Sequence, residues 1–382
     1  MKYTKIEWPD LAVTVNIGAF YPINGVAEFH AMIELNDKFR NAKTQFLDIE
    51  EALKRLQADE QLENSSLILK RYFVSDAVNQ AEFLKSTKDD AVAVSIVQQP
   101  PLNGTKVSVW AYFVADSKIV VDESGTHIME RPHFRHLYNM QLQKPLQDEY
   151  AETEYIFNTY SDLLSKHDCT LKDNCIRTWI YVQGVDIHYT KMVEARVKAF
   201  DREGLTKDTH YLASTGIEGR YLHPQSLVLM DAYSVKGIRN EQIRYLYAPT
   251  HLNPTYEYGV TFERATAVDY GDRRQIYVSG TASIDNKGNI VSPTIIEKQI
   301  ERTLENISML LAEAETGMQD IAKMIVYLRD TADYEIVFAY LNKYYAEIPK
   351  VIVLAPVCRP GWLIEIECIA IKEIENNLFQ PF

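Results

Sequence analysis

The chain has 382 residues and a formal net charge of -13, with 53 Asp and Glu against 40 Lys and Arg. This acidic balance disfavours a sequence-independent nucleic-acid binder, because phosphate neutralisation requires a basic surface. Hydrophobic residues make up 46% of the chain and charged residues 24%, which excludes disordered and fibrous classes, and the length predicts two or three domains' worth of structure.

The first two thirds of the chain alternate predicted strands and helices. The first third predicts a hairpin near residues 10–32, a helix over 43–56, a strand in LILKRYFVSD, a helix over 78–86, and strands in AVAVSIV and KVSVWAYFV. The middle third predicts a hairpin near 118–130, a helix over 154–166, a strand in IRTWIYV, a helix over 189–200, a loop with YLASTGIEGR, and a strand in SLVLMDAYSV.

The last third has the clearest periodicity. After a hairpin region near 260–291, apolar residues at three- and four-residue steps predict a helix over 296–314, because they fall on one helical face. The remaining predicted elements are a strand in IAKMIVYLRD, a helix over 334–345, and strands over 351–354 and 363–371.

An internal repeat links these thirds. Superposing WIYVQGVDIHY on IVYLRDTADY aligns Tyr181 with Tyr327 and Tyr189 with Tyr334, at nearly constant offsets of 146 and 145 residues. The unit is longer than a solenoid repeat, which favours duplicated domains. We therefore predict three α+β modules, over residues 1–118, 119–240 and 241–382. Each would have a mixed sheet with helices on one face, and together they would mimic a cyclic trimer within one chain.

The cysteine and hydropathy patterns bear on metal binding, disulfide bonds and cellular location. The four cysteines form no CxxC pair and have no histidine at zinc-ligand spacing, so we expect neither a metal site nor a disulfide framework. The charged N-terminus lacks an apolar signal core, and no run of about 18 apolar residues occurs. We expect a cytoplasmic protein with no membrane and no nucleic-acid partner.

Several motifs of the last third resemble the RidA family, also called YjgF or endoribonuclease L-PSP. They are SGTASI, QIERTLENISMLL, IAKMIVYLRD followed by YEIVFAYLNKYY, and the closing IEIECIAI, and the resemblance is closest over residues 255–373. It implies a chorismate mutase-like α+β module that assembles as a trimer, with ligand sites between subunits.

A sharper resemblance is to the chorismatases, which combine such modules in one chain. It rests on ASTGIEG at 213–219, FERA at 262–265, SGTASI at 279–284 and VCRPGWLIEIE at 357–367. It implies an enzyme without a cofactor that cleaves the enolpyruvyl ether of chorismate. The products would be pyruvate and either 3-hydroxybenzoate or a dihydroxycyclohexadiene carboxylate. A chain that already holds three modules has little need of partners, so we expect a monomer or a weak homo-oligomer.

Two alternatives stay open. The first is a RidA-like deaminase of imines or enamines; those proteins hold the substrate carboxylate with an arginine fifteen residues before the position of Glu365, and here that residue is Lys350. Lysine is a point charge rather than a bidentate fork, which weakens this alternative. The second alternative is a RidA-like protein that binds a small molecule without catalysis.

Glu365 is the candidate general acid. It lies between Ile364 and Ile366 and alternates with Glu367, so we expect a glutamate on the face opposite its apolar neighbours. Burial would raise the pKa of its carboxyl and make it a proton donor. The competing interpretation is a strand glutamate paired with a surface lysine. The chorismatase resemblance favours catalysis, because it places the catalytic glutamate seven residues after Cys358.

Cys358 is the second catalytic candidate. It stands in a short loop beside Arg359, and a neighbouring guanidinium favours thiolate. A single cysteine is more often a small buried hydrophobe. The resemblance links a cysteine at this place to the formation of 3-hydroxybenzoate rather than simple hydrolysis.

A dianionic substrate such as chorismate requires cations. Arg264 and Arg359 are the candidates, since each guanidinium is able to clamp a carboxylate bidentately. The other predicted substrate-binding residues are Ser214, Thr215, Gly216 and Tyr258. If the modules pack as in a trimer, the loop with Ser214 and the loop with Cys358 would line one pocket.

Three histidines in HIMERPHFRH resemble metal ligands, but their spacing favours surface residues in a loop: His127, His133 and His136. No GxGxxG, P-loop or GxSxG motif occurs.

Overall fold

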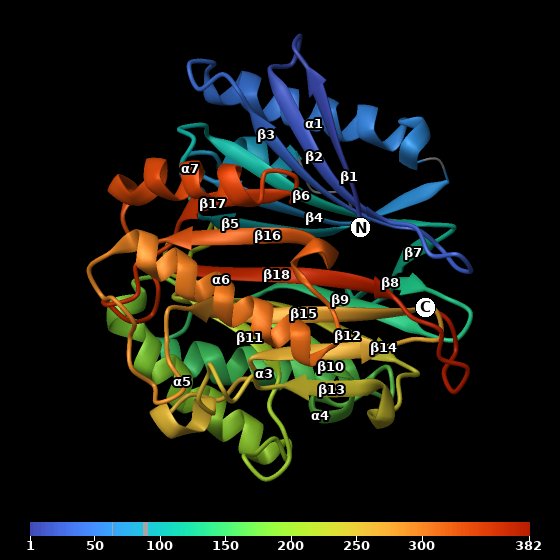
Figure 1. Cartoon of the computed structure of the whole chain (residues 1–382), viewed down its shortest axis with the longest axis vertical. Coiled ribbons are helices and arrows are strands. Elements are labelled where there is room, and N and C mark those ends of the chain that lie inside the picture. Colours follow the sequence, from blue (N-terminus) through green and yellow to red (C-terminus); the bar gives the residue numbers. More distant parts are fainter. Residues whose placement is uncertain (63, 87–90) are drawn as a thin grey trace.

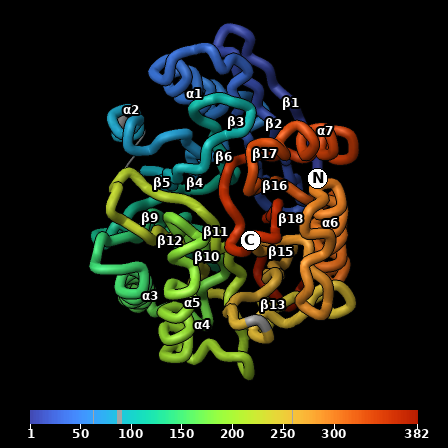
Figure 2. Tube along the Cα trace, turned by 90° about the vertical axis from the view of Figure 1, so that its left-hand side faces the viewer, coloured from blue at the N-terminus to red at the C-terminus, as the bar shows by residue number. Residues whose placement is uncertain are grey.

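The structure is a computed structural model, which describes residues 1–62, 64–86 and 91–382, apart from the side chains of Ser86 and Tyr258. Three six-stranded mixed sheets follow one another along the chain, and helices cover the outer face of each (Figure 1). Figure 2 shows the three modules arranged around a common centre with the helices at the periphery. The predicted α+β pseudo-trimer is confirmed.

The first sheet has the order β1-β2-β3-β6-β4-β5, and α1 and α2 belong to the same module. Its elements are β1 (Lys2–Trp8), β2 (Val13–Phe20), β3 (Glu28–Leu35), α1 (Ala42–Gln57), β4 (Ser65–Val74), α2 (Ala81–Ser86), β5 (Ala93–Gln98) and β6 (Val107–Ala115).

The second sheet has the order β11-β10-β12-β9-β8-β7, which matches the first when it is written from the opposite edge. Its module contains β7 (Lys118–Val121), β8 (His127–Glu130), β9 (Arg135–Leu142), α3 (Glu149–Ser165), α4 (Leu171–Asn174), β10 (Cys175–Val182), α5 (Val185–Arg202), β11 (Ala213–Glu218) and β12 (Val228–Lys236).

The third sheet repeats that order as β13-β14-β15-β18-β16-β17. Its module contains β13 (Ile243–Leu246), β14 (Ala265–Asp269), β15 (Arg273–Ala282), α6 (Ile296–Glu313), β16 (Ile321–Leu328), α7 (Tyr334–Tyr344), β17 (Lys350–Leu354) and β18 (Ile364–Glu373). The exact module boundaries 1–118, 119–240 and 241–382 stay a prediction.

The amphipathic pattern explains how α6 is held. Its predicted apolar face is buried and packs on β15 and β18, so desolvation of this stripe stabilises the helix on its sheet. Strands β10 and β16, each next to an edge strand, are buried along their whole length, including Arg177 and Lys323.

The modules are joined in a ring by equivalent backbone hydrogen bonds. The amide of Gln98 donates to the carbonyl of Arg220 at 2.8 Å, and that of Glu218 donates to Pro356 at 3.2 Å. Leu354 closes the ring by donating to the Pro100 carbonyl at 2.8 Å. Each edge strand β5, β11 and β17 therefore meets a loop of the next module, and three equivalent interfaces result.

Two expectations about loops are wrong. The segment with ASTGIEG is not a loop, because Ala213–Glu218 form β11, a strand parallel to β10. The histidine-rich segment is not a single surface loop either, since His127 lies in β8 and His136 in β9. His136 is fully buried and its Nδ1 lies 2.8 Å from the hydroxyl of Tyr233. Pairing with neighbouring strands, rather than local sequence, decides both segments.

Within the described part of the chain, no helix combines the length and apolarity that crossing a membrane requires.

Candidate active site

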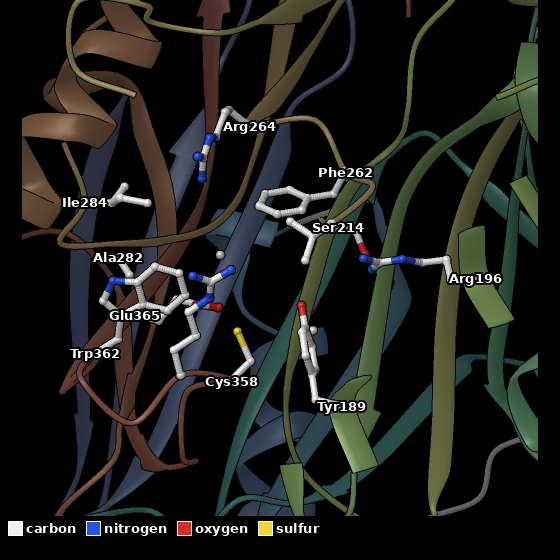
Figure 3. Close-up of a pocket in the computed structure, with 14 residues that line it drawn as sticks. Tyr189, Arg196, Ser214, Phe262, Arg264, Ala282, Ile284, Cys358, Trp362 and Glu365 are labelled. Carbon is white, nitrogen blue, oxygen red and sulfur yellow. The ribbon is translucent and has the colours of Figure 1, made fainter. Parts of the chain in front are cut away.

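A pocket at the interface of the second and third modules brings most of the predicted site residues together (Figure 3). From the second module, α5 and β11 contribute side chains; from the third, β15, β18 and the loops before β14 and β18 do so. The lining residues are Tyr189, Arg196, Ser214, Gly216, Val260, Phe262, Arg264, Gly280, Ala282, Ile284, Cys358, Arg359, Trp362 and Glu365.

Glu365 enters this pocket from β18, opposite Ala282 of β15 and Tyr327 of β16. The residue is only 5% exposed. Burial, followed by the negative charge of Glu367, raises the pKa of its carboxyl to about 8, although Arg177 and Arg264 oppose the shift. The predicted rise in pKa is confirmed, and the carboxyl is protonated at neutral pH.

Glu367 lies two residues further along the same strand in a different electrostatic setting. Its carboxylate accepts hydrogen bonds from Arg177 at 2.8 Å and from Lys323 at 3.0 Å, both buried. These cations outweigh the effect of burial and hold its pKa well below the usual range. A lysine pair is found at Glu367 instead of Glu365, and its lysine, Lys323, is buried rather than at the surface. A fixed negative charge therefore stands beside Glu365.

Thr215 is not among the pocket residues. Its hydroxyl donates to Glu367 at 2.7 Å and accepts from the backbone amide of Gly280 at 3.0 Å. Because β11 is a strand, its side chains alternate between faces, and Thr215 points to the buried ion cluster while Ser214 and Gly216 line the pocket. The prediction that Thr215 binds substrate lacks the geometry to support it.

Cys358 carries a thiol rather than the expected thiolate. Burial, with a smaller contribution from Glu365, raises its pKa to about 12, and Arg359 only partly opposes this rise. The hydroxyl of Tyr189 donates a hydrogen bond to the sulfur, and the two side chains approach each other in Figure 3. The guanidinium alone does not overcome desolvation.

Three arginines surround the pocket. Arg264 donates from Nη2 to the backbone oxygen of Asn253 at 2.9 Å and to its side-chain oxygen at 3.1 Å. Arg359 follows Cys358 in the loop before β18, and its guanidinium lies 5.2 Å from the ring of Trp362. Together they place positive charge where a dianion would bind.

The third arginine, Arg196, was not predicted. It extends from α5 into the pocket, is 1% exposed, and donates from Nε to the Thr261 hydroxyl at 3.2 Å. A signal was present in the sequence, because Arg196 stands four residues after Met192 and four before Phe200 on the apolar face of the helix. A cation on such a face is a candidate for a buried functional group.

Two glycines allow close approach in the site. A Cβ on Gly280 would overlap the carboxylate of Glu365, and a Cβ on Gly216 would lie 3.0 Å from a ring carbon of Tyr189. Ser279 fixes this junction, because its hydroxyl accepts from the Ser214 amide at 2.9 Å and donates to the Glu263 carbonyl at 2.6 Å. The motif SGTASI therefore positions the acid and joins the two modules.

Tyr258 ends a 3-10 turn over Thr255–Tyr258, but its side chain lies outside the described part of the structure. This turn borders a larger cavity of about 390 Å³, which shares Phe262 and Arg264 with the site. The site itself leaves only about 30 Å³ for solvent-sized molecules. Phe262 and Arg264 thus form the partition between a small inner site and a larger outer cavity.

Comparisons with known proteins identify the family. A family model described as endoribonuclease L-PSP matches residues 264–372. A RutC family protein of Pyrococcus abyssi is 34% identical over 100 residues, which is 26% of this chain and 79% of that protein. A RutC family protein of Saccharolobus solfataricus is 36% identical over 99 residues, 25% of this chain and 79% of that protein.

Most of the chain also resembles a solved structure. A chorismatase crystal structure superposes with a TM-score of 0.63 at 16% sequence identity, covering 82% of this chain and 95% of that one. At this level of identity the likeness concerns the fold. Together with the archaeal relatives, it supports one conclusion: the chain belongs to the RutC, or endoribonuclease L-PSP, family.

Proposed function

We propose that the protein cleaves the enolpyruvyl ether of chorismate and releases pyruvate, with Glu365 as the general acid. The observation that carries the proposal is a buried carboxyl with a pKa of about 8 in a pocket that three arginines line. A protonated carboxyl at neutral pH is the group that enol-ether cleavage requires.

The proton of Glu365 would transfer to the terminal methylene of the enolpyruvyl group. An oxocarbenium ion then forms at the ether carbon, water adds to it, and the hemiketal collapses to pyruvate and a dihydroxycyclohexadiene carboxylate. The Glu365 carboxylate regains its proton from the added water. In the second route, the ring also releases pyruvate and then becomes aromatic, which gives 3-hydroxybenzoate. This route consumes no net water, because chorismate contains the same atoms as the two products together.

The arginines would hold the two substrate carboxylates. Because the whole chain carries a net charge of -13, a local cluster of cations is what attracts a dianion to this pocket. Arg264 would exchange its contact with Asn253 for a substrate carboxylate. That movement would join the inner site to the outer cavity and provide the room that the ring requires.

Cys358 would influence the choice of product as a neutral thiol. Its sulfur accepts a hydrogen bond from the Tyr189 hydroxyl and lies in the same pocket as Glu365. In our proposal the sulfur contacts the substrate ring. Its own proton is held too tightly for a role as thiolate base at neutral pH.

The pure protein, incubated with chorismate, tests the proposal when pyruvate is coupled to lactate dehydrogenase. We expect pyruvate release in the parent and a loss of about 10²–10⁴-fold in Glu365→Gln. The matched control is Glu301→Gln, an exposed glutamate on α6, which should keep the parent rate. No pyruvate above background in the parent would defeat the proposal, and ammonia release from an imine substrate would favour the deaminase alternative.

A further inference from the structure

A cluster of buried charges lies between the three modules, which surround a common centre in Figure 2. Its members are at most 2% exposed, and every module contributes at least one of them. They are Arg71 of β4, Arg177 of β10, Asp231 of β12, Lys323 of β16 and Glu367 of β18. We call this set the central charge cluster.

The central charge cluster has more cations than anions. Arg71 donates to the Asp231 carboxylate at 3.1 Å. Glu367 accepts from Arg177 at 2.8 Å and from Lys323 at 3.0 Å. Three cations therefore share two carboxylates, and one positive charge is in excess. An uncompensated charge in the interior is costly, so the excess favours a counter-ion.

The neighbouring acid on β18 does not supply this counter-ion. Burial raises the pKa of Glu365 to about 8, so its carboxyl is neutral at pH 7. Lys323 keeps its charge for the most part, because its pKa, which burial lowers, is still about 8.

Four buried donors at the cluster have no acceptor within residues 1–62, 64–86 and 91–382. Two of them are the Nη1 atoms of Arg71 and Arg177, and the other two are the hydroxyls of Tyr181 and Tyr327. Burial raises the pKa of both phenols well above the usual value, so both hydroxyls keep their protons and can donate. Buried donors in proteins are rarely left without a partner.

These donors lie near one another. The guanidinium carbons of Arg71 and Arg177 lie 4.5 and 5.0 Å from the centre of the Trp179 ring. That of Arg71 is also 5.7 Å from the centre of the Tyr181 ring. Tyr327 is close to the same charges, because Glu367, Arg71 and Arg177 affect the pKa of its hydroxyl, although less than burial does.

The chemistry of the four donors favours an anion over water. A guanidinium donates hydrogen bonds and accepts none. A water molecule has fewer lone pairs than this set has donors, and it carries no charge. A monovalent anion accepts from every donor and also cancels the excess positive charge of the central charge cluster.

From this arrangement we propose that the interior encloses one monovalent inorganic anion of about the size of chloride. Arg71, Arg177, Tyr181 and Tyr327 would hold it by hydrogen bonds. These residues do not line the pocket that contains Glu365, so the anion site is separate from the candidate active site.

A crystal structure of the full-length protein with bromide tests the site directly. Bromide replaces chloride as the only halide throughout purification and crystallisation, and its anomalous scattering identifies it. We expect one bromide peak within hydrogen-bond reach of Nη1 of both Arg71 and Arg177. Ordered water alone at this place, or no density between the two guanidinium groups, would overturn the proposal.

Thermal unfolding tests whether the anion stabilises the protein in solution. The midpoint is compared in sodium bromide and in sodium gluconate at equal ionic strength, since gluconate is too large to be enclosed. Between about 10 and about 500 mM, bromide should raise the midpoint by at least about 2 °C relative to gluconate. No such rise would contradict a bound halide.

Lys323→Met tests the excess charge. It removes one cation and leaves one arginine paired with each carboxylate, Arg71 with Asp231 and Arg177 with Glu367. We expect the bromide-dependent rise of the midpoint to fall by at least about half. A rise equal to that of the parent would contradict the role of the excess cation.

Tyr327→Phe tests a single donor while the ring is kept, and it serves also if Lys323→Met does not fold. The rise in bromide should again shrink. The matched control is Tyr112→Phe, because the buried hydroxyl of Tyr112 already donates to Glu28 at 2.6 Å. Equal rises in the two tyrosine variants would overturn the proposal. None of these measurements uses a substrate, so their outcome is independent of pyruvate release.

Discussion

Glu365 and Glu367 share one strand and one face, yet they hold their protons in opposite ways. Glu367 has two buried cations within hydrogen-bond distance, whereas Glu365 is buried beside the charge of Glu367 itself. The negative charge of Glu367 is thus one reason why Glu365 stays protonated at neutral pH. The pair follows the pattern in which adjacent carboxyls with different surroundings divide the roles of acid and fixed charge.

The backbone at Gly280 leaves room for the Glu365 carboxyl. Gly280→Ala would place a methyl group where this carboxyl lies, so the acid must turn away from the pocket. We expect the rate of pyruvate release to fall by about 10²-fold or more, because small misplacements of a reacting group cost that much. Steady-state kinetics measure the loss, and thermal unfolding shows whether the protein stays folded. A parent-like kcat would contradict this account of the glycine.

Cys358 permits a test of product choice. In Cys358→Ala the neutral thiol and its hydrogen bond from Tyr189 are lost while Glu365 is kept. We expect pyruvate release to continue and the ratio of 3-hydroxybenzoate to dihydroxycyclohexadiene carboxylate to change. Liquid chromatography of the products measures that ratio, and an unchanged ratio removes the cysteine from the mechanism. Cys368→Ala, whose buried thiol lies on another face of β18, is the control.

At the scale of elements, the buried cations hold the interface of the second and third modules. Arg177 of β10 reaches across to Glu367 of β18, and its replacement leaves a buried carboxylate with one cation fewer. We expect Arg177→Met to lower the free energy of unfolding by about 3–5 kcal/mol in urea denaturation. The comparison variant is Lys298→Met, which breaks an exposed pair on α6 and should leave stability unchanged. Equal stability in both variants would contradict the role of the cluster.

The elements with strong periodicity were predictable from sequence. The helix expected over 296–314 is observed over Ile296–Glu313, and that expected over 334–345 over Tyr334–Tyr344. By contrast, the sequence of β11 predicts a loop, because Ser, Thr and Gly are common in turns, whereas its parallel pairing to β10 is a tertiary contact. Local secondary-structure propensity does not reveal such a tertiary contact.

The sequence predicts those residues of the site that belong to a recognisable motif. Glu365, Cys358, Arg264, Arg359, Ser214 and Gly216 come together in one pocket. Arg196 was missed because a helix pattern alone does not show which neighbour its face meets. The protonation of Cys358 was missed because burial, which sequence does not give, outweighs the adjacent guanidinium.

At the scale of the whole molecule, one chain with three modules has interfaces that differ. A homotrimer would repeat the same residues three times, whereas here the position of Glu365 is occupied by Leu229 and Ser108 in the other modules. Duplication within a chain therefore permits one module to hold an acid that the equivalent positions of the other two lack.

This asymmetry predicts the stoichiometry of substrate binding. A chorismate analogue with a saturated ether side chain cannot accept the proton, and it should bind about one molecule per chain in titration calorimetry. Glu365→Gln should keep this stoichiometry. A value near three would mean that the equivalent interfaces bind the dianion alike, in conflict with a substrate site at the interface of the second and third modules.

The pH dependence of pyruvate release tests the role of Glu365 most directly. The acid works only while protonated, and its pKa is raised from 4.5 to about 8, so kcat/KM should hold up to neutral pH and fall as pH rises through about 8. The residual kcat/KM of Glu365→Gln should not show this fall at high pH. A parent profile that stays flat or rises from about pH 6 to about pH 9.5 would contradict Glu365 as the proton donor.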